Sequence, residues 1–181
     1  KEINFDMKFR DMVSTGIKFF KSSPGTIPEK SLKVEKLDSI NIAQYQGKPR
    51  LIWFGHSAFL LQMEQKTILI DPMFGEVPAP HPLLGTKRFS KELPIEIKKL
   101  PKIDAVLISH DHYDHLDYGT IQKLKDKVGM FFTPLGVGAH LQEWGIEKER
   151  IVELNWWEEV RFEELTFVCT PARHFSGRGF G

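Results

Sequence analysis

Short hydrophobic runs recur between residues 50 and 170, each closed by a turn residue or a polar cluster. Runs of this length, bounded by turn signals, are typical of buried β-strands. We therefore predict strands at residues 51–54, 58–61, 67–70, 105–109, 130–133, 151–154 and 165–169. Because only a short polar link at 64–66 separates two of these runs, we expect their strands to pair antiparallel.

Other stretches have a helical spacing of apolar residues. Ile121, Leu124 and Val128 recur every three or four residues after Asp117, a residue type that caps helix starts, and Gly129 is expected to end this helix. A second helix is predicted over residues 137–144.

The first 48 residues carry no recognisable chemistry. Phe5, Phe9, Met12 and Val13 predict at most a turn or two of helix before Pro and Gly residues break the pattern. We interpret 1–48 as an extension packing on a main domain at 49–181.

A proline-rich segment spans residues 73–101 without a clear element pattern. Long loops inside a compact domain are usually functional or disordered. We predict that this one forms a lid or wall over a functional site.

Composition narrows the protein class. With 41% hydrophobic and 27% charged residues and 181 residues, the chain is typical of one globular domain. A net charge of +1 gives no electrostatic footprint for nucleic acid, and a single cysteine, Cys169, excludes an internal disulfide. No apolar run is long enough to span a membrane. A cytoplasmic location is expected. Membrane association stays open, because the chain starts at Lys1 rather than Met. Trp156 and Trp157 are candidates for a lipid or aromatic contact, with hydrophobic cover as the alternative.

The chemistry concentrates directly after the predicted strand at 105–109. Three of the seven histidines, interleaved with two aspartates, lie within a few residues: His110, Asp111, His112, Asp114 and His115. Neutral imidazole and carboxylate suit a borderline cation such as zinc. At a strand end, the rings of His110 and His112 point the same way and can share one cation, whereas Asp114 and His115 face a neighbouring position. The alternative is a solvated histidine-rich loop.

The pattern His-x-His-x-Asp-His resembles the signature of the metallo-β-lactamase superfamily. Together with the stretches 53–57, 70–72, 104–117 and 170–174, it is similar to the branch of N-acyl-phosphatidylethanolamine phospholipase D-like proteins and, more distantly, ascorbate-6-phosphate lactonases. The resemblance covers residues from about 50 to 181. It implies an α+β fold, an αββα sandwich of two face-to-face sheets with helices outside and metals at one edge.

The resemblance also implies a ligand set. His110, His112 and His174 would bind one divalent cation, and Asp114 and His115 a second, with zinc expected and manganese or iron as alternatives. For His174 the alternative is an ordinary loop histidine. In such a centre a hydroxide held between the cations attacks phosphorus or a carbonyl carbon. Asp114 would also orient this nucleophile, which makes it the predicted catalytic residue.

Further candidates surround these ligands. Asp71 and Asp111 are predicted carboxylate partners for metal-binding histidines. His56 is a candidate for supporting the metal ligands or for contacting the substrate. The alternative is a structural role, in which it forms hydrogen bonds between strands. Arg173 and Arg178 are candidates for clamping a phosphate, with solvated loop arginines as the alternative.

These observations favour a metal-dependent hydrolase, with a small-molecule or lipid phosphodiester as the expected substrate and no nucleic acid. The alternatives are a lactonase or other ester hydrolase, and a non-catalytic metal-binding or assembly module. The pattern of the resembled family continues with a metal-bridging Asp and a final His beyond the stretch that ends at Gly181. We therefore expect the N-terminal portion of the sandwich here, with the C-terminal part supplied as a partner by a further segment.

Overall fold

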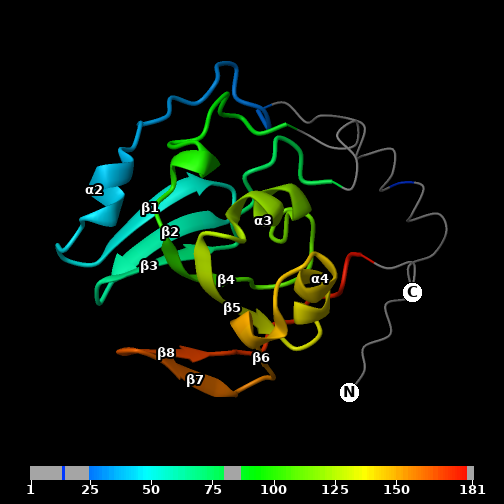
Figure 1. Ribbon diagram of the computed structural model, residues 1–181. Helices are drawn as coiled ribbons and strands as arrows, with labels where there is room; N and C mark the ends of the chain where they lie inside the picture. Colours follow the sequence, from blue (N-terminus) through cyan, green and yellow to red (C-terminus); the bar gives the residue numbers. More distant parts are fainter. Residues whose placement is uncertain (1–13, 15–24, 80–86, 179–181) are drawn as a thin grey trace.

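The computed structural model describes residues 14, 25–79 and 87–178, and Figure 1 shows how they are arranged. In chain order the elements are α2 (Ser39–Ala43), β1 (Arg50–Gly55), β2 (Ala58–Met63), β3 (Lys66–Ile70), the 3-10 turn η1 (Ile97–Lys99), β4 (Ile103–Leu107), α3 (Tyr118–Leu124), β5 (Val128–Pro134), α4 (Gly138–Glu143), η2 (Lys148–Arg150), β6 (Ile151–Leu154), β7 (Glu159–Phe162) and β8 (Leu165–Val168). Each predicted strand is thus present, with small shifts at its ends. The helix predicted from Phe5 to Val13 lies outside the described residues.

Strands β1 to β6 form one sheet in sequence order, and β7 and β8 form a second. The predicted antiparallel pair is confirmed, since β2 and β3 pair antiparallel with Leu61 opposite Ile68. From β3 to β6 all neighbours are parallel. The carboxyl ends of these parallel strands therefore meet at one edge of the sheet, which is where such folds place their ligands.

Helices α3 and α4 cover one face of the large sheet, and the β7–β8 hairpin lies against the other (Figure 1). Strand residues on the helix side alternate with those on the hairpin side, as the period of two requires. The main core on the helix side includes Leu60, Leu69, Val106, Phe131, Ile121, Leu124 and Leu141, all fully buried.

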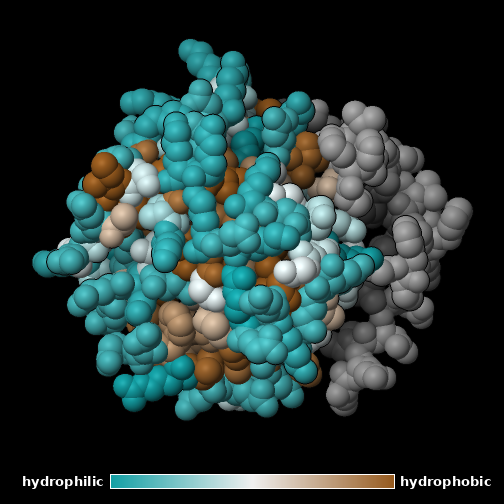
Figure 2. All heavy atoms as spheres, viewed as in Figure 1, coloured by the Kyte–Doolittle hydropathy of each residue, from teal (hydrophilic) through white to brown (hydrophobic). Residues whose placement is uncertain are grey.

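A smaller apolar cluster joins the two sheets. Phe132 of β5 is 5% exposed, and its ring centroid lies 5.2 Å from that of Phe162 and 4.9 Å from that of Phe167. In the lower part of the view in Figure 2, where Figure 1 places the hairpin, some hydrophobic side chains show between hydrophilic ones. Helices, mixed sheet and hairpin make an α+β arrangement, which agrees with part of the expected sandwich.

The predicted end of the first long helix is wrong. Helix α3 begins after Asp117, as expected, but ends at Leu124, and Val128 and Gly129 belong to β5. A Cβ on Gly129 would lie 2.7 Å from the carbonyl oxygen of Asp104 on β4. The glycine thus permits close approach of two strand backbones rather than ending a helix.

The described parts of the segment 73–101 differ from the predicted lid or wall, and residues 80–86 lie outside the described residues. Phe74, Ile95 and Leu100 are buried in the main core, and the backbone N–H of Phe74 donates to Thr120 Oγ1 of α3 at 3.0 Å. The described parts of the segment, 73–79 and 87–101, do not line the cavity beside the histidines. In these described parts the buried apolar side chains form a layer of the core.

The described part of the N-terminal stretch lies along this same segment. Leu37 N–H donates to the carbonyl of Pro94 at 2.9 Å, and Ile42 of α2 is 1% exposed. Within the described residues, no helix has the length and hydropathy needed to cross a membrane.

Candidate metal centre

The loop between β4 and α3 carries most of the candidate ligands. It turns tightly, because the N–H groups of His115 and Leu116 donate to the carbonyl of His112 at 3.0 and 2.8 Å. The helix that follows is capped by Asp117, whose carboxylate accepts from Thr120 N at 2.9 Å. A strand on one side and a capped helix on the other therefore hold the loop in place.

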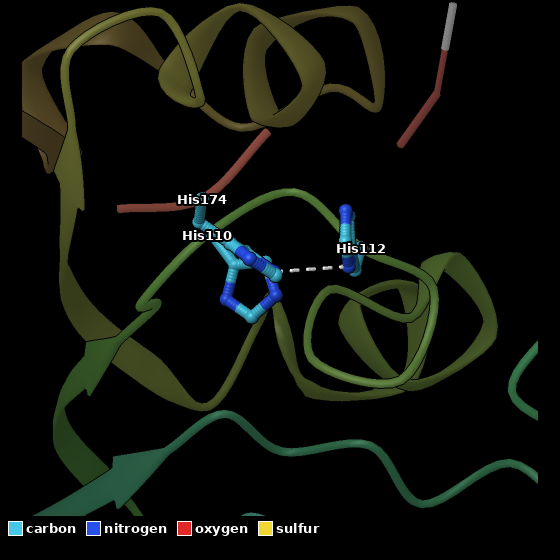
Figure 3. A group of neighbouring side chains, drawn as sticks. All are labelled: His110, His112 and His174. Atoms are coloured by element: carbon cyan, nitrogen blue, oxygen red, sulfur yellow. Dashed lines mark hydrogen bonds between the residues drawn. The ribbon is translucent and has the colours of Figure 1, made fainter. Parts of the chain in front are cut away.

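The first group of potential ligands consists of His110, His112 and His174, whose ligand atoms lie within 4.8 Å of one another. Figure 3 shows the rings gathered together, with His174 Nε2 3.3 Å from His112 Nδ1. Nε2 of His110 and Nε2 of His112 are buried and have no hydrogen-bond partner in the part of the chain that the structure describes. Since an unpartnered buried ring nitrogen is unfavourable and three imidazoles are a common zinc ligand set, these residues fit a bound cation.

A second group lies beside the first and comprises His56, Asp114 and His115, again within 4.8 Å. His56 Nε2 lies 2.8 Å from Asp114 Oδ2. His56 sits in the β1–β2 turn with a left-handed φ of 47°, and the indole N–H of Trp53 donates to its carbonyl at 2.8 Å. The structure thus brings His56 to the predicted second metal position.

Asp71 holds the ring of His115. It directly follows β3, is 4% exposed, and its Oδ2 lies 2.8 Å from His115 Nδ1. Burial lowers the pKa of His115, but the hydrogen bond and charge of Asp71 outweigh it, so that this pKa is raised. Asp71 therefore lies where a carboxylate partner of a ligating histidine was predicted.

Burial and neighbouring charges shift the pKa values of His110 and Asp114. Burial, followed by the neighbouring histidines, lowers the pKa of His110 to about 4. Burial raises the pKa of Asp114, but its backbone hydrogen bond and His115 and His56 more than compensate, so that the pKa is lowered. A neutral imidazole and an ionised carboxylate are the forms that bind a cation.

Asp111 differs from its predicted role. Instead of a histidine, its carboxylate accepts hydrogen bonds from the hydroxyl of Ser176 and from Gly177 N at 3.3 Å. A Cβ at Gly177 would collide with Cδ2 of His112, so that any larger residue there would displace this ring. Asp111 thereby ties the segment carrying His174 to the β4–α3 loop.

The two arginines have different environments. Arg178 donates to the carbonyls of Asp111 and Leu116, and its guanidinium lies 4.3 Å from the centroid of Tyr113. These contacts use two of the five N–H donors of its guanidinium and brace the loop. The clamping of a phosphate by Arg178 stays a prediction. Arg173 is exposed and lines the adjoining cavity.

A cavity of about 920 Å³ opens beside the first group. Its polar end includes Ser109, His110 and His174. Its apolar walls include Leu107, Phe132, Leu154, Trp156 and Phe167. The arrangement can hold a molecule that has a charged centre next to an apolar portion.

Three residues of the site were not predicted from the sequence: Ser109, Ser176 and Gly177. Ser109 directly precedes His110, and a hydroxyl beside a ligand is a signal that sequence reading could have used. Ser176 and Gly177 contact a residue 65 and 66 positions earlier, which no local pattern reveals.

The chain resembles several characterised and uncharacterised proteins. It is 49% identical over 130 residues to an uncharacterised protein of Mycobacterium tuberculosis, covering 70% of this chain and 34% of that protein. It is 31% identical over 136 residues to N-acyl-phosphatidylethanolamine-hydrolyzing phospholipase D 1 of Caenorhabditis elegans, covering 70% of this chain and 38% of the relative. The chain thus spans little more than a third of these relatives' lengths.

The fold has a counterpart among solved structures. The diiron β-hydroxylase CmlA of Streptomyces venezuelae matches with a TM-score of 0.53 at 24% identity, over 70% of this chain and 24% of that one. The model of the beta-lactamase superfamily domain matches residues 66–181, which include the β4–α3 loop and His174. With this match over most of its length, the chain belongs to the beta-lactamase superfamily domain family.

Proposed function

We propose that this chain carries the metal-binding part of a metal-dependent hydrolase that cleaves a phosphodiester. The observation that supports it best is the pair of adjoining ligand groups. In the first group, the buried Nε2 atoms of His110 and His112 have no hydrogen-bond partner among residues 25–79 and 87–178. The phosphodiester part rests on the likeness to the phospholipase D relative, of which the chain spans 38%.

In this proposal His110, His112 and His174 hold one divalent cation, and Asp114 and His115 a second, with zinc expected and manganese or iron as alternatives. When bound, such cations lower the pKa of water and stabilise charge developing on a substrate oxygen. The pattern of the resembled family has two further ligands, an Asp and a His, which are not among these residues.

The chain's own residues have distinct tasks in the reaction. Asp114, held by His56 at 2.8 Å, orients the attacking water. Arg173 attracts an anionic substrate at the cavity rim, and the apolar walls hold its hydrocarbon portion. Water adds to phosphorus, a P–O bond breaks, and the released alcohol takes the proton that the water loses. Trp156, 61% exposed, is where contact with a lipid surface would occur.

Two experiments test the proposal. Elemental analysis of the protein purified without added metal should find about two cations per chain if the site is complete, and one or none if these residues hold only part of it. In a side-by-side assay a phosphodiester should be hydrolysed faster than a lactone. Hydrolysis of the lactone alone would contradict the proposed phosphodiesterase activity and indicate an ester hydrolase.

The substitution Asp114→Asn separates catalysis from simple metal binding. We expect it to reduce turnover by about 10²-fold or more, because the carboxylate both binds and orients. The matched control Asp126→Asn alters an exposed carboxylate after α3 and should leave turnover unchanged. Metal bound by the wild type without turnover of either substrate would favour the non-catalytic metal-binding module.

A further inference from the structure

Asp71 and Ser109 meet because their strands are parallel neighbours. Asp71 follows β3 and Ser109 follows the end of β4, and Asp71 N–H donates to the carbonyl of Leu107 at 2.9 Å. The Asp71 carboxylate then accepts twice from Ser109: its Oδ1 from the backbone N–H at 2.7 Å, and its Oδ2 from the hydroxyl at 2.6 Å. The serine is thus fixed at both backbone and side chain.

The hydrogens in this cluster can be assigned by counting. A serine hydroxyl has one hydrogen, and the Asp71 carboxylate takes it. Ser109 Oγ therefore faces His110 Nδ1, 2.9 Å away, with a lone pair. The two atoms form a hydrogen bond only if the imidazole carries its hydrogen on Nδ1.

The same logic applies to His115. Its Nδ1 lies 2.8 Å from Asp71 Oδ2 and 3.3 Å from Ser109 Oγ, both of which accept. Both rings are then Nδ1–H tautomers, with Nε2 free for a ligand. For His110 this is the buried Nε2 that has no partner among the described residues.

We propose that Asp71 and Ser109 form a positioning pair that sets the tautomers of His110 and His115, and so prepares one ligand in each of the two candidate metal groups. This inference rests on the proposed function for its purpose, but the tautomers themselves are properties of the metal-free protein. Asp71 acts on His115 directly and on His110 only through the hydroxyl of Ser109. The two histidines therefore respond differently when that hydroxyl is removed.

Nitrogen-15 NMR of the histidine rings in the metal-free protein tests this directly. In the wild type, at a pH where both rings are neutral, His110 and His115 should both be protonated on Nδ1 and not on Nε2. Ser109→Ala should turn His110 into a tautomer mixture and leave His115 as Nδ1–H. Ser109→Thr keeps the hydroxyl and should restore the wild-type pattern. A wild-type His110 protonated on Nε2, or one unchanged by Ser109→Ala, would overturn the proposal.

Zinc titration of the same variants measures the consequence. Loss of a partner behind a metal ligand lowers metal affinity by about 10- to 100-fold. With Ser109→Ala we expect this loss of affinity for the zinc bound by the first group, and with Ser109→Thr a smaller loss. With Asp71→Asn, zinc binding should be weaker at both groups. Equal affinity of the wild type and Ser109→Ala would contradict the inference. The expected tautomers and affinities without any hydrolysis would support this inference and refute the proposed function alone.

Discussion

Single residues decide how this site responds to protons. His110 and His115 lie in the same loop, yet burial lowers the pKa of the first, whereas Asp71 raises that of the second against the effect of burial. In both rings, Nε2 must carry no hydrogen if it is to bind a cation. Proton competition is therefore stronger at the second group than at the first.

The stability of the metal-free protein should vary with pH in two separate windows. For His110 the folded pKa is about 4 against an ordinary 6.5. The unfolded chain therefore binds a proton first, and the free energy of unfolding falls as the pH drops from about 6.5 to 4. Because the ring is partly exposed, we expect about 1–2 kcal/mol rather than the full effect of the shift. His115 stabilises the fold below pH 6.5, and this contribution is lost as the pH rises through its raised folded pKa.

Urea unfolding between pH 4 and 9 measures both windows. His110→Gln should flatten the acid side only, and His115→Gln should remove the loss on the alkaline side only. Each variant is the other's control. An acid slope unchanged by His110→Gln would show that other groups cause it.

At the scale of elements, the site depends on where strands and helices stop. Four of the candidate ligands lie in the loop between the end of β4 and the start of α3, so that the helix start also bounds the loop that carries them. Asp117 Oδ2 accepts from both the backbone N–H and the hydroxyl of Thr120, which is 1% exposed. Replacement by alanine leaves those donors unpaired.

We expect Asp117→Ala to lower the free energy of unfolding by about 1–2 kcal/mol, the usual effect of losing a helix cap. Chemical denaturation gives the value. The control Asp126→Ala changes an exposed aspartate just after the same helix and should stay within about 0.5 kcal/mol of the wild type. Equal effects of the two substitutions would mean that the cap contributes nothing.

The hairpin β7–β8 is attached through aromatic contacts with Phe132. Removing this buried ring should cost about 3–5 kcal/mol, because the hairpin cannot fill the space left behind. Phe89→Ala is the control, since that side chain is 42% exposed and should cost less than about 1 kcal/mol. Comparable losses in thermal unfolding would contradict the packing seen between the two sheets.

At the scale of the whole molecule, metal binding and folding should be coupled. The ligands of the first group come from the β4–α3 loop and from a segment after β8. His112 and His174, for example, are 62 positions apart in the sequence. A cation that binds only the folded arrangement stabilises it by mass action. At 100 times its dissociation constant, zinc should add about 2.7 kcal/mol.

Thermal unfolding with zinc and with a chelator checks this coupling. The wild type should melt about 5–10 °C higher with zinc. His174→Gln should show less of this increase, because one of three ligands in the first group is gone. An identical increase in that variant would place the zinc elsewhere on the protein.

The sequence by itself determined the strands, the start of α3 and the histidine cluster, because these depend on neighbours a few residues away. Apolar periodicity, a capping aspartate and ligand types at fixed spacing are all local signals. The end of α3 was predicted wrongly, because Gly129 does not end a helix. It lies in β5, where the lack of a side chain lets the backbone approach the carbonyl of Asp104.

Only the tertiary structure decided which distant groups share the site. Parallel pairing of β3 and β4 brings Asp71 to Ser109, and the return of the chain after β8 brings Ser176 to Asp111. Such contacts join residues tens of positions apart, and no periodicity along the chain encodes them. Residue type determines the chemistry of these side chains, whereas strand order and register determine which of them lie in contact.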